Sequence, residues 1–182
     1  VVAGAQSVEA FTIKASAKAF LILSQSLYSN PVGSMIRELS TNAYDAHVMV
    51  GKKDEPFILT LPNSIEPTFK IRDFGPGMSH KDIMSVYTTF FESTKTDSND
   101  VVGCLGLGSK SPFGVADSFT VTSYYNGVKT IYSSFLNDAR IPSIAKFAEV
   151  ETDEENGLEI EVAIKSDNFH TFNREVNAQL KY

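Results

Sequence analysis

The chain has 182 residues, 42% of them hydrophobic and 21% charged, which is the composition of one ordinary globular domain. Its formal net charge of -6 argues against a general nucleic-acid binder, because such proteins carry basic patches that displace counterions from phosphates. The single cysteine, Cys104, excludes an intramolecular disulfide and a thiolate zinc cluster. The longest apolar run, Ala19–Leu23, is far shorter than the roughly 20 residues that span a bilayer, so we expect no transmembrane helix.

The first part of the chain predicts a short strand and two helices. Phe11–Lys14 alternates between apolar and polar residues and predicts the strand, and 15–28 carries apolar residues at helical spacing. Asn30-Pro31 predicts the start of a second helix, with Asn as the N-cap and Pro at the first helical position. We expect this helix to run to about Val50 and to end at Gly51.

The remainder of the chain is predicted to be mostly strand. Strands are expected at 57–61, 68–71, 118–125, 128–135, 143–150 and 158–164, and helical segments at 81–88, 112–116 and 168–180. Asn126-Gly127 is the strongest short hairpin signal, Asp153–Gly157 predicts a second turn, and the polar stretch 93–100 predicts a mobile segment. This order of elements predicts an α+β fold, a two-layer α/β sandwich whose sheet is mixed but mostly antiparallel, with helices on one face.

Three polar residues of the second predicted helix, Glu38, Asn42 and Asp45, occur at i, i+4 and i+7. On a helix of 3.6 residues per turn they share one narrow stripe. Apolar residues flank this stripe, so it should lie near the core, where unpaired carboxylates are costly. The alternative is a solvated polar face. Two carboxylates and an amide beside the core instead favour a metal–phosphate site.

Two glycine-containing segments follow the stripe. Asp73–Met78 (Asp-Phe-Gly-Pro-Gly-Met) adds a carboxylate on a flexible turn, although alone it also fits an ordinary turn after a strand. Gly103–Ser111 is not a Walker A loop, because a serine separates its last glycine from Lys110. Ser111 also stands where a dinucleotide-binding fingerprint has its third glycine. With both of these phosphate-binding motifs excluded, the segment can still surround an anion with its backbone amides at the start of a helix. This favours a nucleotide pocket.

In this order the three motifs resemble those of the GHKL ATPase superfamily, which includes gyrase B, Hsp90-type chaperones, histidine kinases and MutL. Longer strings are similar to the bacteriophage rIIA (rapid-lysis) protein family, namely Phe11–Ser16, Leu27–Asn30, Arg72–Ser79, Ser98–Asp100 and Gly106–Phe113. The resemblance implies a Bergerat-type sandwich that binds ATP or ADP with Mg²⁺ and hydrolyses ATP slowly. It implies one domain over 1–182, the N-terminal part of a longer protein, with a flexible lid at 79–102.

The resemblance also implies a role for each matching residue. Glu38 would be the general base for the attacking water, Asn42 the Mg²⁺ ligand, and Asp73 the acceptor for the adenine amino group. The nucleotide wall would include Asp45, Ala46, Gly75, Gly77 and Met78, and the phosphate cradle with its charge partners would include Lys95, Gly103, Gly106, Gly108, Ser109 and Lys110.

Leu158 departs from the superfamily pattern, in which a Thr after the glycine of a late strand supports the adenine-binding Asp. The missing hydroxyl should weaken base binding by about 1 kcal/mol, roughly a factor of five in affinity. Nucleotide binding is therefore a safer expectation than turnover. Two alternatives stay open: a non-hydrolysing module whose lid orders on nucleotide binding, and a histidine-kinase domain, for which no phosphoacceptor helix precedes the pocket.

The resemblance implies a role in lysis timing or host exclusion, a nucleotide-dependent homodimer, and an unidentified host or phage protein as partner. The resemblance also implies a location in the host cytoplasm. Any association with the inner membrane would be peripheral and would depend on regions or partners not in this chain. The three histidines and the cysteine are not expected to perform chemistry. His47 is predicted to lie on a helix surface, and His80 and His170 to face solvent.

Overall fold

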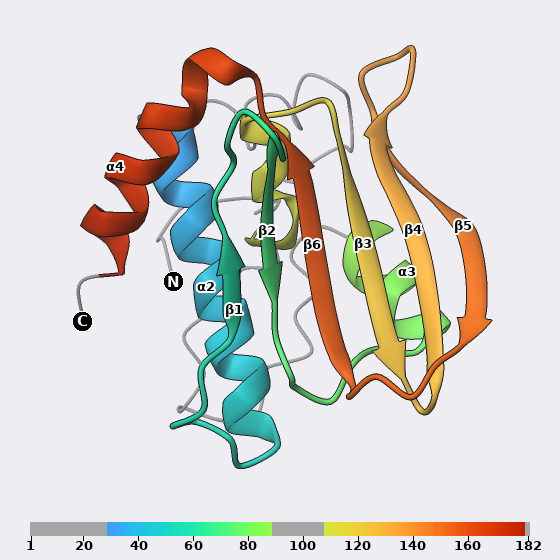
Figure 1. Ribbon diagram of the computed structural model, residues 1–182. Coiled ribbons are helices and arrows are strands. Elements are labelled where there is room, and N and C mark those ends of the chain that lie inside the picture. Colours follow the sequence, from blue (N-terminus) through green and yellow to red (C-terminus); the bar gives the residue numbers. More distant parts are fainter. Residues whose placement is uncertain (1–28, 89–107, 181–182) are drawn as a thin grey trace, which may run out of the picture.

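The computed structural model describes residues 29–88 and 108–180, which form one sheet with helices packed on one face (Figure 1). The strands are β1 (Ile58–Thr60), β2 (Thr68–Arg72), β3 (Ser118–Tyr125), β4 (Val128–Leu136), β5 (Pro142–Glu151) and β6 (Gly157–Ala163). The helices are α2 (Pro31–Met49), α3 (His80–Thr88) and α4 (Phe169–Gln179), with 3₁₀ segments η2 (Gly108–Gly114) and η3 (Ser166–Asn168). This arrangement confirms the predicted α+β two-layer sandwich.

The described strands are arranged in the order β1-β2-β6-β3-β4-β5, and each neighbouring pair is antiparallel. The β3–β4 hairpin turns at Asn126 and Gly127, whose φ values of 52° and 76° are both left-handed, as a tight hairpin with these residues requires. The predicted turn at 153–157 has a different role. It connects β5 at the sheet edge to β6 in the sheet centre, so the strands on its two sides are not neighbours.

Helix α2 begins and ends where the sequence predicts. Its N-cap is Asn30, whose Oδ1 accepts the Gly33 N–H at 3.1 Å, and Pro31 is the first helical residue. The helix ends at Met49, just before Gly51, whose φ of 76° is the left-handed conformation typical of a helix C-terminus. The position of the polar stripe along the helix is therefore as expected.

The core lies between α2, α4 and the inner face of the sheet. The buried α2 residues Met35, Ile36, Leu39 and Ala43 pack in one cluster with β-strand residues that include Phe69, Ile71, Val121 and Ile160. Helix α4 joins this cluster through Phe172, whose ring lies 5.3 Å from that of Phe69. Since α2 is held by these apolar contacts, the positions of its polar residues are set by the core.

The described beginning of the predicted lid is helix α3. Its N-terminus has a reciprocal capping arrangement, in which the Asp82 N–H donates to Ser79 Oγ at 3.2 Å and the Ser79 N–H donates to Asp82 Oδ2 at 3.3 Å. Ile83 and Tyr87 of α3 are buried in the core cluster. The expected strand at 11–14, helix at 15–28 and mobile segment at 93–100 lie outside the described residues. None of the described helices has a stretch long and apolar enough to cross a membrane.

Candidate functional site

The polar stripe of α2 extends from the surface into the core. Glu38 and Asn42 are half-buried, and Asp45 is fully buried. Gly108, the first residue of η2, lies directly against the outer part of the stripe. A Cβ atom at Gly108 would lie 3.0 Å from Glu38 Oε2 and 3.3 Å from Asn42 Nδ2, closer than side chains normally pack. The structure therefore brings the end of the glycine-rich segment onto Glu38 and Asn42, and only glycine fits there without displacing them.

Asp73 directly follows β2 and is held by the first residues of β6. The Asp73 N–H donates to the Leu158 carbonyl at 2.9 Å. Its carboxylate accepts two backbone N–H groups through the same oxygen, Oδ1, from Gly75 at 2.9 Å and from Leu158 at 3.2 Å. Among the described residues, no hydrogen bond reaches Oδ2. The carboxyl group is therefore fixed on one side, with one oxygen left for a further donor.

Burial dominates the electrostatics of Asp73, because it raises the pKa of this carboxyl above its ordinary value. The N–H groups of Gly75 and Leu158, and then the Arg72 guanidinium, lower this pKa without outweighing burial. The same carboxylate contributes to the raised pKa of the buried Tyr87, after the larger effect of burial on that phenol. Asp73 is thus a largely desolvated acceptor.

The turn after Asp73 packs tightly on α2 and β3. A Cβ atom at Gly75 would lie 2.5 Å from Ala46 Cβ and 2.9 Å from the Ala46 carbonyl carbon, so the turn contacts the backbone of α2 there. Gly77 has a φ of 69°, and a side chain there would overlap the Tyr124 carbonyl oxygen. Both predicted wall glycines are therefore required by close approach to a neighbouring element, and Ala46 forms the surface on which the turn rests.

Met78 is held at both of its backbone polar groups by one side chain of β3. The Met78 N–H donates to Ser123 Oγ at 3.1 Å, and the Ser123 hydroxyl donates to the Met78 carbonyl at 2.7 Å. Ser123 was not among the predicted site residues, because its sequence context indicates only a strand. Its burial marks it once the fold is known, since a buried hydroxyl needs a partner.

Lys110 is buried, and its ammonium group donates to the Val86 carbonyl near the end of α3 at 2.6 Å. A second contact, 3.4 Å long, reaches Ser109 Oγ. A lysine at a helix C-terminus interacts favourably with the terminal carbonyl groups. The structure thus places Lys110 as a link between η2 and α3. The other predicted phosphate-cradle residues, Lys95, Gly103 and Gly106, lie outside the described residues.

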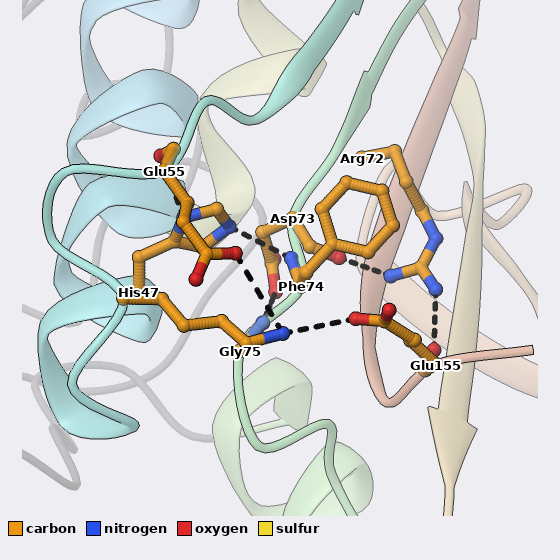
Figure 2. A network of polar contacts seen from close by, with 8 residues as sticks. His47, Glu55, Arg72, Asp73, Phe74, Gly75 and Glu155 are labelled. Carbon is orange, nitrogen blue, oxygen red and sulfur yellow. Dashed lines mark hydrogen bonds and ion pairs between the residues drawn. The ribbon is translucent and has the colours of Figure 1, made fainter.

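The prediction that His47 lies on the helix surface is wrong, since its side chain is only 1% exposed. Its Nε2 accepts the Phe74 N–H at 2.8 Å, and its Nδ1 lies 3.0 Å from the Glu55 carbonyl oxygen (Figure 2). The signal was present in the sequence, because His47 follows the buried Leu39 and Ala43 at i+8 and i+4. His170 is exposed as predicted; His80 is also exposed, but it stacks on Tyr132 with ring centroids 5.8 Å apart.

Arg72 connects the turn to the β5–β6 connection. Its guanidinium carbon lies 4.0 Å from the Tyr124 ring centroid and 4.8 Å from that of Phe74. The guanidinium group donates to the Asp73 carbonyl and, at 2.6 Å, to the Glu155 carbonyl (Figure 2). The nearby Lys52 ammonium pairs with the Glu155 carboxylate at 2.9 Å. Segments from three parts of the chain therefore meet around Asp73.

No protein-family model matches the chain. It is 30% identical over 140 residues to the chaperone protein HtpG of Halalkalibacterium halodurans, and 31% identical over 140 residues to that of Clostridium perfringens. Each match covers 65% of this chain and 22% of the chaperone, so the chain spans about a fifth of the length of these curated relatives. The similarity, together with the fold and the order of the motifs, supports a GHKL-like domain.

Proposed function

We propose that this domain binds ATP with Mg²⁺ and hydrolyses it slowly. The observation that carries the proposal is the meeting of both glycine-containing segments with one helix. Gly108 lies against Glu38 and Asn42, and Gly75 lies against Ala46 two turns further along α2. One helix thereby spans a site with a phosphate end and a base end. The similarity to the HtpG chaperones supports the same proposal.

At the base end, Asp73 is suited to accept a hydrogen bond from the exocyclic amino group of adenine. Its Oδ1 is already bound to two backbone N–H groups, which leaves Oδ2 for the ligand. A buried acceptor without a donor is costly, so a ligand N–H there adds both affinity and selectivity. Met78, half-buried and packed on the core, is placed by Ser123 to contact the base. Asp45 and Gly77 complete this wall in the proposal.

At the phosphate end, the donor set fits Mg²⁺. In residues 29–88 and 108–180 no cluster of three or more His, Cys, Asp or Glu side chains forms a cage for a metal ion. Mg²⁺ at nucleotide sites usually takes one or two protein oxygens and completes its shell with phosphate oxygens and water. The Asn42 amide oxygen is such a ligand, beside the carboxylate of Glu38. When bound, Mg²⁺ offsets the negative charge of the phosphates.

Glu38 is the proposed general base. Its side chain is 27% exposed and therefore accessible to water, while its contact with Gly108 fixes it next to the segment that we propose to hold the phosphates. The carboxylate would orient the attacking water and accept its proton, while the backbone of Gly108 and Ser109 contributes positioning. Catalysis of this kind comes mostly from alignment, so modest turnover is expected.

A second candidate is a nucleotide-responsive binding module without hydrolysis, and Leu158 favours it. Leu158 supports Asp73 only through its backbone N–H and carbonyl, because its side chain carries no hydroxyl. In either case we propose a phage rIIA-like role in lysis or host exclusion, in the host cytoplasm. Nucleotide-dependent homodimerisation or an unidentified host or phage partner would transmit the nucleotide state.

Calorimetric titration with ATP and Mg²⁺, followed by phosphate release, tests the proposal. We expect wild type and Glu38→Gln to bind ATP alike, and phosphate release in Glu38→Gln to fall by roughly 10²–10⁴-fold. Glu66→Gln changes a partly exposed carboxylate that pairs with Lys70 on the β1–β2 connection, is the matched control, and should release phosphate at the wild-type rate. Binding without turnover in wild type would leave the non-hydrolysing module. Absence of ATP binding in wild type would contradict both candidates.

A further inference from the structure

We propose that His47 is the positioning residue for base recognition. By binding the Phe74 N–H it fixes the turn that presents Asp73 Oδ2 to the amino group of adenine. The inference rests on the proposed function, and it goes further because it assigns a role to a residue that the motifs do not include. Its evidence is the set of contacts around one buried imidazole and one peptide group (Figure 2).

The hydrogen bonds of His47 indicate which ring nitrogen donates and which accepts. Nε2 accepts the Phe74 N–H at 2.8 Å, so this nitrogen carries no proton. Nδ1 lies 3.0 Å from the Glu55 carbonyl oxygen, which can only accept, so Nδ1 carries the proton. The neutral Nδ1–H tautomer satisfies both contacts at once. The buried ring is further confined by Phe57 and Phe74, at centroid distances of 6.5 and 6.2 Å.

His47 acts on the peptide group that joins Asp73 to Phe74. The N–H of this group is bound by His47, and its carbonyl oxygen accepts a hydrogen bond from Arg72. Both ends of one planar group are thus held from opposite directions. The Asp73 N–H is separately bound to the Leu158 carbonyl at 2.9 Å. With the backbone fixed on both sides of its Cα, the direction of the Asp73 carboxylate is fixed as well.

Two substitutions separate the two contacts of His47. The amide of Asn reaches the place of Nδ1 and can keep the contact with Glu55, but it is too short to accept the Phe74 N–H. The longer amide of Gln reaches the place of Nε2, where its oxygen can accept this N–H. His47→Asn and His47→Gln therefore remove different halves of the same network. His170→Asn changes an exposed histidine on α4, outside the proposed site, and is the matched control.

The test measures the affinity of each variant for Mg²⁺·ATP and for the Mg²⁺ complex of purine riboside triphosphate, which lacks the amino group. Wild type should prefer ATP. We expect His47→Asn to lose about fivefold or more in ATP affinity with little change for the second nucleotide, so that the preference disappears. His47→Gln and His170→Asn should keep most of the preference. Circular dichroism spectra establish that each variant is folded.

Three results would overturn the inference. If His47→Asn loses the same factor of affinity for both nucleotides, His47 has a structural role only. The same conclusion follows if His47→Gln loses as much of the preference for ATP as His47→Asn does. An unchanged ATP preference in His47→Asn would mean that the Asp73 turn does not depend on this hydrogen bond. If wild type binds neither nucleotide, the proposed function itself fails. If His47→Asn does not fold, loss of the ATP preference in a folded His47→Gln still counts against the inference.

Discussion

At the scale of single residues, Asp73 combines burial with a carboxylate that is hydrogen-bonded through only one oxygen, as its proposed binding role requires. Its carboxylate is buried, with both backbone N–H donors on the same oxygen. A residue selected for stability alone would not keep a desolvated charge with an unused oxygen. The raised pKa of this carboxyl reflects that cost, because burial disfavours the charged form more in the folded protein than in the unfolded chain.

This raised pKa predicts how Asp73→Asn changes stability with pH. Since the native state holds the proton more firmly, the contribution of Asp73 to the free energy of unfolding is largest in acid and decreases as pH rises above the ordinary value of 3.8. Asn keeps an oxygen for the Gly75 and Leu158 N–H groups and does not titrate. The stability of Asp73→Asn relative to wild type should therefore increase with pH across the acid range. Urea unfolding of both proteins at a series of pH values measures this difference in stability. A relative stability of Asp73→Asn that decreases with pH would contradict the raised pKa of Asp73.

The sequence predicted individual residues well where their pattern depended on the local chain. The stripe of Glu38, Asn42 and Asp45 follows from helical periodicity, and the structure places it as expected beside the core. His47 was predicted wrongly although its spacing from Leu39 and Ala43 puts it on the buried face of α2, because its hydrogen-bond partners, Glu55 and Phe74, are brought to it only by the tertiary fold. Ser123 was missed for the same reason, since its hydroxyl is paired with a backbone carbonyl on another segment. The hydrogen bond from Lys110 to the Val86 carbonyl is likewise a tertiary contact that the local sequence does not indicate.

At the scale of elements, helix α2 depends on a cap that also joins it to α4. Asn30 Oδ1 caps the helix at Gly33, and its Nδ2 donates to Glu175 Oε2 at 2.7 Å. The hydrogen bond from Asn30, followed by that from Arg174, lowers the pKa of the Glu175 carboxyl. The start of the helix that carries the candidate site is therefore tied to the C-terminal helix by one side chain.

Asn30→Ala is expected to lower the free energy of unfolding at neutral pH by about 1–2 kcal/mol, the usual cost of removing an N-cap. Because the folded pKa of Glu175 lies below its ordinary value of 4.5, its share of the stabilisation is present above that pH and disappears as the pH falls through the folded pKa. The difference from wild type should thus become smaller in acid. Glu175→Gln, which keeps the cap, separates the two contributions. If Asn30→Ala lowers the free energy of unfolding by the same amount at neutral and acid pH, the contribution assigned to ionised Glu175 is contradicted.

Element boundaries were predictable wherever the sequence contains capping or turn residues. Asn30-Pro31, Gly51 and Asn126-Gly127 each fixed the boundary of a helix or strand. The short helical segment predicted at 112–116 is a 3₁₀ segment that begins earlier, at Gly108. Gly108 lies against Glu38 and Asn42, and such a tertiary contact leaves no trace in local propensity.

At the scale of the whole molecule, the order of the strands was the part that local patterns did not reveal. The stretch 153–157 has the composition of a tight turn, yet it joins an edge strand to a central one. Strand β6 pairs with β2 on one side and with β3 on the other, so that Ile160 faces Ile71 and Val121. Only tertiary pairing decides between this arrangement and a simple meander, since both bury the same apolar residues.

This topology predicts an order of events in refolding. The β3–β4 pair is joined by a two-residue turn, whereas the β2–β6 pair joins residues distant in sequence, which is slower because the closed loop is longer. Pulse-labelled hydrogen exchange should find protection of the β3–β4 amides first. The amides bonded across β2–β6 and β3–β6 should become protected later and together. Protection across β2–β6 before β3–β4 would contradict this order.

The central position of β6 has a consequence for protein synthesis. The ribosome translates four proposed site residues before Gly157, namely Glu38, Asn42, Asp73 and Gly108. Leu158, whose N–H and carbonyl hold Asp73, is translated only after them. A nascent chain therefore contains every proposed nucleotide contact from the earlier motifs before the corner around Asp73 can form. A premature stop codon before Gly157 would remove the middle of the sheet, not its edge, and would leave two separate groups of strands.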